Sequence, residues 1–298
     1  MKLMKALTAA ALLAPLLPLT QAHAQQATLD KIKDSGSISL AYRESSIPFS
    51  YLDDKAQPVG FGVDICDKVV DEIKKVTGRA DLKVTRQAVT SANRIPLLVN
   101  GTIDLECGST TNNSDRAKQV TFAVNYFYTG TRFLVKADSG IKSLADLNNK
   151  VIVSTTGTTN FRIMRTIITE QKLPIELIGA KDHAESALLV ESSRAAAFAM
   201  DDILLYGLRA SAQNPASLAV VGEPIQVEPY AIMMRKDDAG IKKVVDGVLA
   251  GLMKSGEFER LYRKWFMSPI PPKGINLNAP MGKELTDNLK ALSDKPAT

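Results

Sequence analysis

Cysteine and histidine are scarce in this sequence. Its 298 residues include two cysteines, Cys66 and Cys107, and two histidines. A structural metal site needs about four such ligands at close spacing, so no metal site is expected. An oxidising compartment would permit a bridge between the two cysteines. Cys66 falls in a predicted helix and Cys107 at the end of a predicted strand, so a disulfide and two buried free thiols both remain open.

Familiar catalytic motifs are also absent. The sequence has no nucleophile elbow, no HExxH, no phosphate loop of the GxxxxGK type and no GxGxxG. The common hydrolase, protease, nucleotide-binding and dinucleotide-binding classes therefore lose support. The sequence indicates neither an enzyme nor a bound cofactor.

Neither sign of charge dominates the chain. It has 37 basic and 32 acidic side chains, and the basic ones are spread along predicted helices beside acidic neighbours. Such a distribution is typical of a solvated surface. Neither a nucleic acid nor a membrane surface is expected as a partner.

Only the N-terminus carries a long apolar run. Lys2 and Lys5 precede the apolar stretch 6–19, and a small-x-small site ends at Ala24. This order predicts a signal peptide over residues 1–24, cleaved after Ala24, and therefore a periplasmic protein. The alternative is a membrane anchor, but a spanning helix needs about 20 apolar residues and this stretch is shorter and contains two prolines.

The rest of the chain alternates short apolar runs with amphipathic helical patterns, which predicts an α/β fold. Expected strands lie at 37–42, 82–89, 103–107, 151–154, 175–178, 196–200 and 218–221. Expected helices lie at 63–76, 93–100, 160–172, 184–190, 201–210, 241–254 and 257–266, with a weaker pattern at 282–292.

Two lobes suit this length better than one large domain. We expect the chain to cross between them near 131–137 and 227–235, with 230–235 forming a crossing strand. The first lobe would then comprise residues 25–131 and 231–298. The second lobe, 132–230, would be an insertion in the first.

Two arginines stand where a ligand of an open α/β sheet would lie. Arg43 directly follows the strand 37–42, where it could form a fork with a carboxylate or lie on the surface beside Glu44. Arg94 falls in the first turn of a helix that Ser91 or Asn93 could cap. A cation is disfavoured at that end, so Arg94 indicates an anion in front of it, with an exposed arginine as the alternative.

Weaker candidates surround these arginines. Ser109 and Thr111 lie in the polar turn 108–113, Thr159 opens a helix, and His183 precedes another. A lone histidine is more often a surface or capping residue than a ligand. Of Asp201 and Asp202, one is expected to cap a helix, and the other could face a cleft and hold an ammonium group.

Over nearly its whole length after residue 24, the sequence resembles a known family in several collinear segments. These are RESS at 43–46, SANRIPLL at 91–98, ECGSTTNN at 106–113, AKDH at 180–183, MDD at 200–202 and PIPPK at 269–273. They look like the type II periplasmic amino-acid binding proteins of ABC importers, and among them those for glutamate and aspartate. The sequence departs from the family at one point. A family member has a cysteine within the segment that matches 231–233, whereas this chain has none there and has Cys66 instead. Any family disulfide that involves that position is therefore in doubt here.

The resemblance implies a fold and a set of roles. It implies two α/β lobes joined by a two-stranded hinge, which close on an acidic amino acid and present it to a membrane permease, with the protein as a monomer. Arg94 would bind the α-carboxylate, and Asp201, Ser109 and Thr111 the ammonium group. Four residues remain for the side-chain carboxylate and for contacts across the cleft, and the resemblance does not divide these two roles among them. They are Arg43, Ser91, Thr159 and His183.

Other functions are possible on the same scaffold. A dehydratase acting on prephenate-like dicarboxylates would need a general acid in the cleft, where Asp201 instead suits an ammonium group. A receptor's sensing domain would require a transmembrane helix downstream. Binding of glutamine or cystine is opposed by the pair Arg43 and Arg94, and the sequence does not rank glutamate against aspartate.

Overall fold

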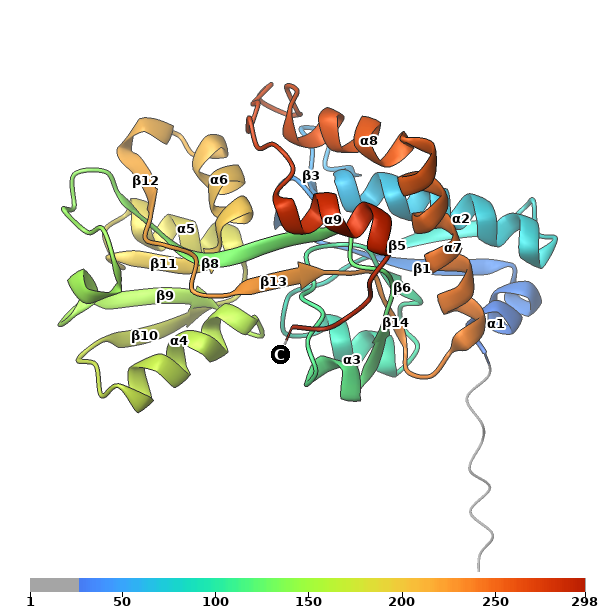
Figure 1. The fold of residues 1–298 in the computed structure, drawn as a ribbon, viewed down its shortest axis with the longest axis horizontal. Helices are drawn as coiled ribbons and strands as arrows, with labels where there is room; N and C mark the ends of the chain where they lie inside the picture. Colours follow the sequence, from blue (N-terminus) through green and yellow to red (C-terminus); the bar gives the residue numbers. More distant parts are fainter. Residues whose placement is uncertain (1–26, 298) are drawn as a thin grey trace, which may run out of the picture.

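The computed structural model describes residues 27–297 and has the expected α/β architecture. Figure 1 shows two groups of helices and strands with β8 and β13 running between them. We call the part built on the five-stranded sheet the first lobe and the part built on the six-stranded sheet the second lobe. The predicted signal peptide lies outside the described residues.

The sheet of the first lobe has the strand order β5-β1-β6-β14-β7. Strands β5, β1 and β6 are parallel, and β14 is antiparallel to both β6 and β7. In sheet order the strands span Lys83–Ala88, Ser37–Tyr42, Leu105–Glu106, Met233–Arg235 and Val120–Phe122. A small sheet contains β2 (Ser45–Ser46), β3 (Ser50–Leu52) and β4 (Pro58–Val59).

The longer helices cover this sheet with stripes of buried apolar side chains. In α2, for example, Ile65, Val69 and Ile73 are buried at helical spacing, and the helix ends at Gly78 with a left-handed φ of 69°. The helices of this lobe are α1 (Thr28–Ser35), α2 (Phe61–Thr77), α3 (Arg94–Val99), η1 (Arg116–Lys118), α7 (Ala239–Ser255), α8 (Glu257–Phe266) and α9 (Lys283–Ala291).

The sheet of the second lobe has the order β10-β9-β11-β8-β12, with β13 also paired to β8. In sheet order the strands span Glu176–Ala180, Val151–Thr155, Ala197–Asp201, Phe127–Lys136 and Leu218–Val221, and β13 spans Val227–Tyr230. The helices are η2 (Leu144–Leu147), α4 (Thr159–Glu170), α5 (His183–Glu191), α6 (Asp202–Ser211) and η3 (Pro215–Ser217).

The connection between the lobes is an antiparallel ladder of β8 and β13. Phe127 pairs with Tyr230 and Gly130 with Val227, and β8 then continues into the second sheet, where Thr131 pairs with Asp201. The single crossing strand predicted over 230–235 is wrong. The chain leaves β13 at Tyr230 and enters the first sheet as β14, because residues 233–235 find their partners in β6 and β7.

An aromatic cluster attaches this ladder to the first lobe. The ring of Phe49 lies 4.8 Å from that of Phe127 and 5.2 Å from that of Tyr230, and Phe127 lies 5.1 Å from Phe266. Such ring pairs stabilise beyond their buried area. The two strands are therefore fixed where they leave the first lobe.

The two cysteines form a disulfide, with Cα atoms 5.9 Å apart. It decides between the alternatives that the sequence left open. The bond ties Cys66 in α2 to Cys107, the residue just before the polar turn 108–113. None of the helices within residues 27–297 has both the length and the apolar character needed to cross a bilayer.

Candidate functional site

The predicted site residues lie at the carboxyl ends of the parallel strands in both sheets. Arg43 follows β1, the turn 108–113 follows β6, and Asp201 ends β11. All eight predicted residues are buried, with none more than 4% exposed. They are Arg43, Ser91, Arg94, Ser109, Thr111, Thr159, His183 and Asp201.

Arg43 is buried rather than paired with Glu44 on the surface. Its Nε donates to the carbonyl of Val89 at 3.1 Å, and its Nη2 donates to Ser91 Oγ at 2.8 Å. Burial and the neighbouring charge of Arg94 lower the pKa of Arg43 to about 9, so the guanidinium stays charged at neutral pH. Its Nη1 has no hydrogen-bond partner within residues 27–297.

Arg94 is the second buried guanidinium. It begins α3, a helix of six residues, and the predicted side-chain cap is missing because Asn93 Oδ1 accepts from the backbone N–H of Thr90 instead. Among the described residues, nothing accepts a hydrogen bond from Arg94 Nε or Nη1. Buried polar atoms are nearly always paired, so unpaired donors on two neighbouring arginines indicate a site for acceptors from outside the chain.

His183 joins the second lobe to Arg43. Its Nδ1 lies 2.9 Å from Thr155 Oγ1, and its Nε2 lies 3.3 Å from Arg43 Nη2. Because a guanidinium can only donate, Nε2 accepts and the proton is on Nδ1. Burial, Arg43 and Arg94 hold the pKa of His183 well below its usual range, so the ring is neutral. The helix cap is Asp182, and the capping or surface role weighed for His183 is wrong.

Glu228 on β13 connects the two lobes at the other side of the cluster. Its Oε2 accepts from Thr111 Oγ1 and from Thr159 Oγ1, each at 2.5 Å, and its Oε1 accepts from Gln226. The hydroxyls of Thr111 and Thr159 also lie 3.3 Å apart. A single buried carboxylate thus joins the turn 108–113 to the start of α4.

Asp201 occupies the N-cap position of α6 but makes no side-chain cap bond. Instead it accepts from Asn160 Nδ2 at 2.7 Å and from the hydroxyl of Tyr230. Burial and the nearby charge of Glu228 raise the pKa of Asp201 well above its usual range. Asp202 accepts from the backbone N–H of Ile203 in the first turn of α6. Asp202 is therefore the residue that bonds to the helix start, and Asp201 is the one that lies in the cluster.

The two serines have different partners. Ser91 accepts from Arg43, whereas Ser109 donates to Ser46 Oγ at 3.3 Å. Among the described residues, Ser109 makes no side-chain hydrogen bond to Asp201 or Thr111, with which the resemblance groups it.

Sequence reasoning missed three charged residues of this cluster. Glu106 is buried with Oε2 bonded to Thr110, and its Oε1 has no partner among the described residues. Arg116 and Glu228 are buried between the lobes. Glu228 could have been noticed as the one charge in the predicted crossing region before Arg235, whereas Arg116 lies in an ordinary polar turn.

The cluster therefore combines three arginines with three carboxylates, and the unpaired donors are concentrated on Arg43 and Arg94. This arrangement suits a small molecule with two anionic groups and one cationic group. A hollow of about 880 Å³ between α2 and α7 lies elsewhere and is lined mainly by apolar and small residues of the first lobe.

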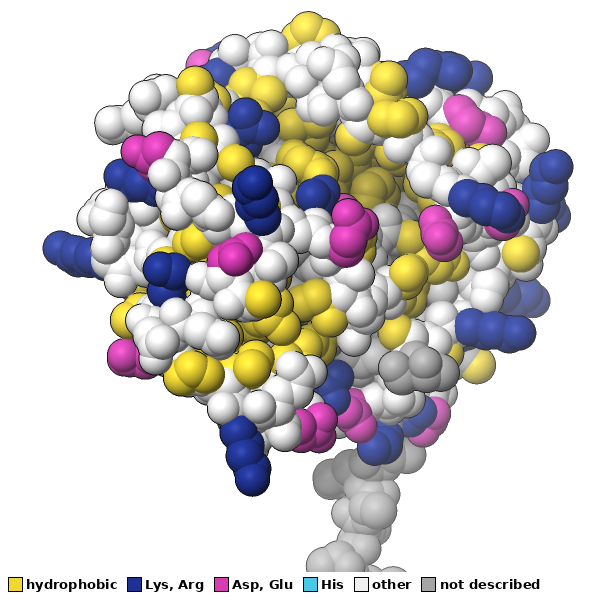
Figure 2. Space-filling view, turned by 60° about the vertical axis from the view of Figure 1, so that its left-hand side comes forward, with side chains coloured by type: hydrophobic (Ala, Val, Ile, Leu, Met, Phe, Trp, Pro, Cys, Tyr) yellow, Lys and Arg dark blue, Asp and Glu magenta, His cyan; other side chains and the backbone are white. Residues whose placement is uncertain are grey.

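The outer surface shows no comparable concentration of charge on the face drawn in Figure 2, where Lys and Arg alternate with Asp and Glu. Within residues 27–297, no group of three or more His, Cys, Asp or Glu is placed to hold a metal ion.

Comparisons with known proteins agree with this architecture. Residues 38–268 match the model of the bacterial extracellular solute-binding proteins, family 3. The chain is 48% identical to the L-glutamate/L-aspartate-binding protein of Pseudomonas aeruginosa, over 91% of this chain and 90% of that protein. It is 46% identical to the glutamate/aspartate import solute-binding protein of Escherichia coli, over 92% of this chain and 90% of that protein.

Solved structures show the same fold. A crystal structure of the solute receptor for L-cysteine of Neisseria gonorrhoeae has a TM-score of 0.70 at 26% identity, and covers 81% of this chain and 94% of that one. Both sequence relatives are binding proteins and not enzymes. The chain belongs to family 3 of the bacterial extracellular solute-binding proteins.

Proposed function

We propose that this protein binds L-glutamate, L-aspartate or both in the periplasm and delivers the bound amino acid to an ABC permease. The observation that carries the proposal is the pair of buried guanidiniums, Arg43 and Arg94, whose nitrogens include three without partners in residues 27–297. The names of the relatives from Pseudomonas aeruginosa and Escherichia coli support the same ligand class.

The proposed roles are those that the resemblance implies, and the charges of Arg43, Arg94 and Asp201 are compatible with them. Arg94 binds the α-carboxylate, and Asp201 with Thr111 and Ser109 receives the ammonium group. Arg43 with Ser91, Thr159 and His183 receives the side-chain carboxylate and ties the lobes together. A neutral amide in place of that carboxylate leaves Arg43 less satisfied, which gives selectivity for acids over amides.

Closure of the lobes is the signal that a permease reads in this proposal. The lobes comprise residues 25–131 with 231–298 and residues 132–230, and the protein acts as a monomer after removal of residues 1–24. Ligand contacts from both lobes favour the closed form. Amino-terminal sequencing of the exported protein should begin at Gln25.

The test is a calorimetric titration of protein refolded free of ligand with glutamate, aspartate, glutamine and asparagine. Tight binding of at least one acid, with its amide much weaker, is expected. Arg94→Ala should weaken binding of the acid at least about thirtyfold, because removing one partner of a buried charge pair costs about 2–5 kcal/mol. Stronger binding of an amide, or no effect of Arg94→Ala, contradicts the proposal.

A further inference from the structure

Arg116 reaches from one lobe to the other, although the roles proposed above give it no part in holding the ligand. Its Nη1 donates to the carbonyl of Thr111 at 3.0 Å in the first lobe. Its Nη2 donates to the carbonyl of Gly157 at 3.1 Å in the second lobe. The planar guanidinium thus spans the turn 108–113 and the turn just before α4.

The carbonyl that Arg116 holds belongs to Gly157, which also lies very close to the backbone of Ser91 and Ala92 in the first lobe. Gly157 has a φ of 78°, and a Cβ built there would lie 2.5 Å from the Cα of Ala92 and 2.7 Å from the carbonyl carbon of Ser91. Only glycine allows this approach. Through this contact the turn before α4 in the second lobe packs against residues 91–92, which lead into Arg94.

The surroundings keep Arg116 charged and in place. Its side chain is buried, and burial together with Arg94 lowers its pKa to about 9, whereas Glu228 and Asp201 favour the charged form. The guanidinium therefore remains protonated at neutral pH. It balances two buried carboxylates through space while its hydrogen bonds go to backbone carbonyls.

A neighbouring contact shows what an ordinary bridge between the lobes looks like. Asp115 Oδ2 lies 2.6 Å from Arg162 Nη1, and both side chains are about half exposed, at 55% and 49%. Exposed ion pairs contribute little to stability. Arg116 and Arg162 are thus a buried and an exposed arginine that both reach across the same interface.

We propose that Arg116 is a positioning residue for lobe closure. It acts through the carbonyls of Thr111 and Gly157. Its function is to stabilise the closed form, in which the turn before α4 lies against the turn 108–113. When the lobes separate, the bond to Gly157 must break while the bond to Thr111 stays within the first lobe. Loss of Arg116 should therefore favour the open form.

The inference rests on the proposed function for its kinetic consequence. Ligand enters the open form, so the association rate should not fall, whereas release requires opening and should accelerate. A hydrogen bond to a charged group corresponds to about tenfold to a hundredfold in an equilibrium constant. We expect Arg116→Met to raise the dissociation rate and the Kd for glutamate or aspartate by that factor.

The experiment compares parent, Arg116→Met, Arg116→Lys and Arg162→Met as the matched control. Calorimetry gives Kd, stopped-flow mixing gives the two rate constants, and thermal unfolding without ligand reports stability. Arg116→Lys keeps the charge and can hold one carbonyl, so it should recover part of the affinity. Arg162→Met should stay within about twofold of the parent, as expected for an exposed pair.

Small-angle scattering of the ligand-free proteins separates this inference from the proposed ligand class. A larger radius of gyration for Arg116→Met than for the parent supports the positioning role even if the parent binds neither acid. Equal radii together with equal dissociation rates overturn it. A loss of affinity that Arg162→Met also shows overturns the proposal. A loss of affinity that comes only from the association rate overturns it as well. If Arg116→Met is unfolded without ligand, Arg116→Lys decides by the same two measurements.

Discussion

Arg43 Nη2 and His183 Nε2 lie 3.3 Å apart, and the two side chains come from different lobes. The imidazole accepts and is neutral, because burial and the charges of Arg43 and Arg94 hold the pKa of His183 well below its usual range. A second proton on this ring would place a cation against Arg43. The contact therefore exists only in one protonation state.

Stability should fall as the pH drops below about 6.5, the ordinary pKa of histidine. In the unfolded chain His183 takes up a proton there, whereas in the folded protein its depressed pKa prevents this. The unfolded state thus binds more protons, and each such group contributes up to about 1.4 kcal/mol per pH unit. Urea unfolding of the parent and His183→Gln between pH 7 and 5 measures this slope. A slope that His183→Gln leaves unchanged contradicts the assignment.

Selectivity between acids and amides should depend on Arg43. Arg43→Met removes the donor proposed for the side-chain carboxylate, so glutamate or aspartate should bind at least about thirtyfold more weakly. The corresponding amide should lose much less affinity, since it places no charge there. Calorimetry with both ligands gives the ratio. Equal losses for acid and amide would assign Arg43 to a group that both ligands share.

Binding should release protons through Asp201. Burial and Glu228 raise the pKa of this carboxyl in the protein, whereas a ligand ammonium group beside it favours the ionised form. Affinity should therefore increase as the pH rises from the ordinary range of aspartate toward the raised pKa. The binding enthalpy should differ between two buffers of unequal ionisation enthalpy, and Asp201→Asn should reduce the difference. Identical enthalpies in both buffers would argue against this linkage.

The disulfide should stabilise the whole fold. Cys66 and Cys107 are 41 residues apart, and a loop of that length gives about 4 kcal/mol by the chain-entropy model. Serine at both positions should lower the free energy of unfolding by about that amount and weaken ligand binding, since Cys107 leads into the turn 108–113. Unfolding with and without reductant provides the control, because reductant should affect the parent alone. A variant as stable as the oxidised parent is incompatible with this account.

Elements whose ends are set locally could be predicted from the sequence. The strands 37–42 and 218–221 and the helix 257–266 have the predicted bounds, and α8 begins directly after Gly256. The strand over 230–235 could not be predicted correctly, because its apolar run is continuous while its partners change from β8 to β6 and β7. Pairing of that kind is decided by distant parts of the chain.

Some residues of the candidate site could likewise be recognised from the sequence, and others could not. Arg43 and Arg94 were recognisable because a cation at a strand end or a helix start needs a reason. Arg116 was not, because it is buried only where the lobes meet and no local pattern distinguishes it from a solvated residue, and Glu228 was marked only by its place in the predicted crossing region. Of the contacts between the lobes, the sequence pointed to His183 and Thr159 but gave no reason to single out Arg116.

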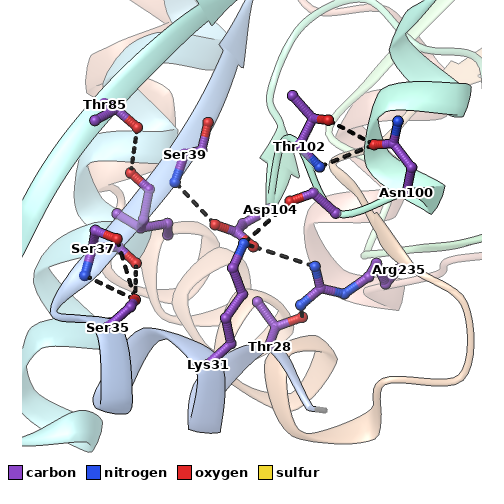
Figure 3. A network of polar contacts seen from close by, with 12 residues as sticks. Thr28, Lys31, Ser35, Ser37, Ser39, Thr85, Asn100, Thr102, Asp104 and Arg235 are labelled. Atoms are coloured by element: carbon purple, nitrogen blue, oxygen red, sulfur yellow. Dashed lines mark hydrogen bonds and ion pairs between the residues drawn. The ribbon is translucent and has the colours of Figure 1, made fainter. Parts of the chain in front are cut away.

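Changes at Asp104 should affect stability but not ligand binding. Asp104 comes directly before β6, whereas the turn 108–113 follows that strand. Its carboxylate is fully buried and is held by Lys31 at 2.8 Å, by Arg235 at 3.4 Å and by the backbone N–H of Ser39, as Figure 3 shows. Asp104→Asn removes the charge and leaves Arg235, which is also buried, without its carboxylate.

Breaking a buried pair in this way costs about 3–5 kcal/mol. Lys31→Met should cost only about 1 kcal/mol, because Lys31 is one-third exposed and Arg235 still pairs with Asp104 in that variant. Both variants should keep the parent's Kd for glutamate or aspartate, since this network touches none of the proposed ligand-binding residues. Denaturant unfolding and calorimetry test the two statements separately. A large change in Kd for Asp104→Asn would mean that β6 transmits changes from this network to the turn that holds the ligand.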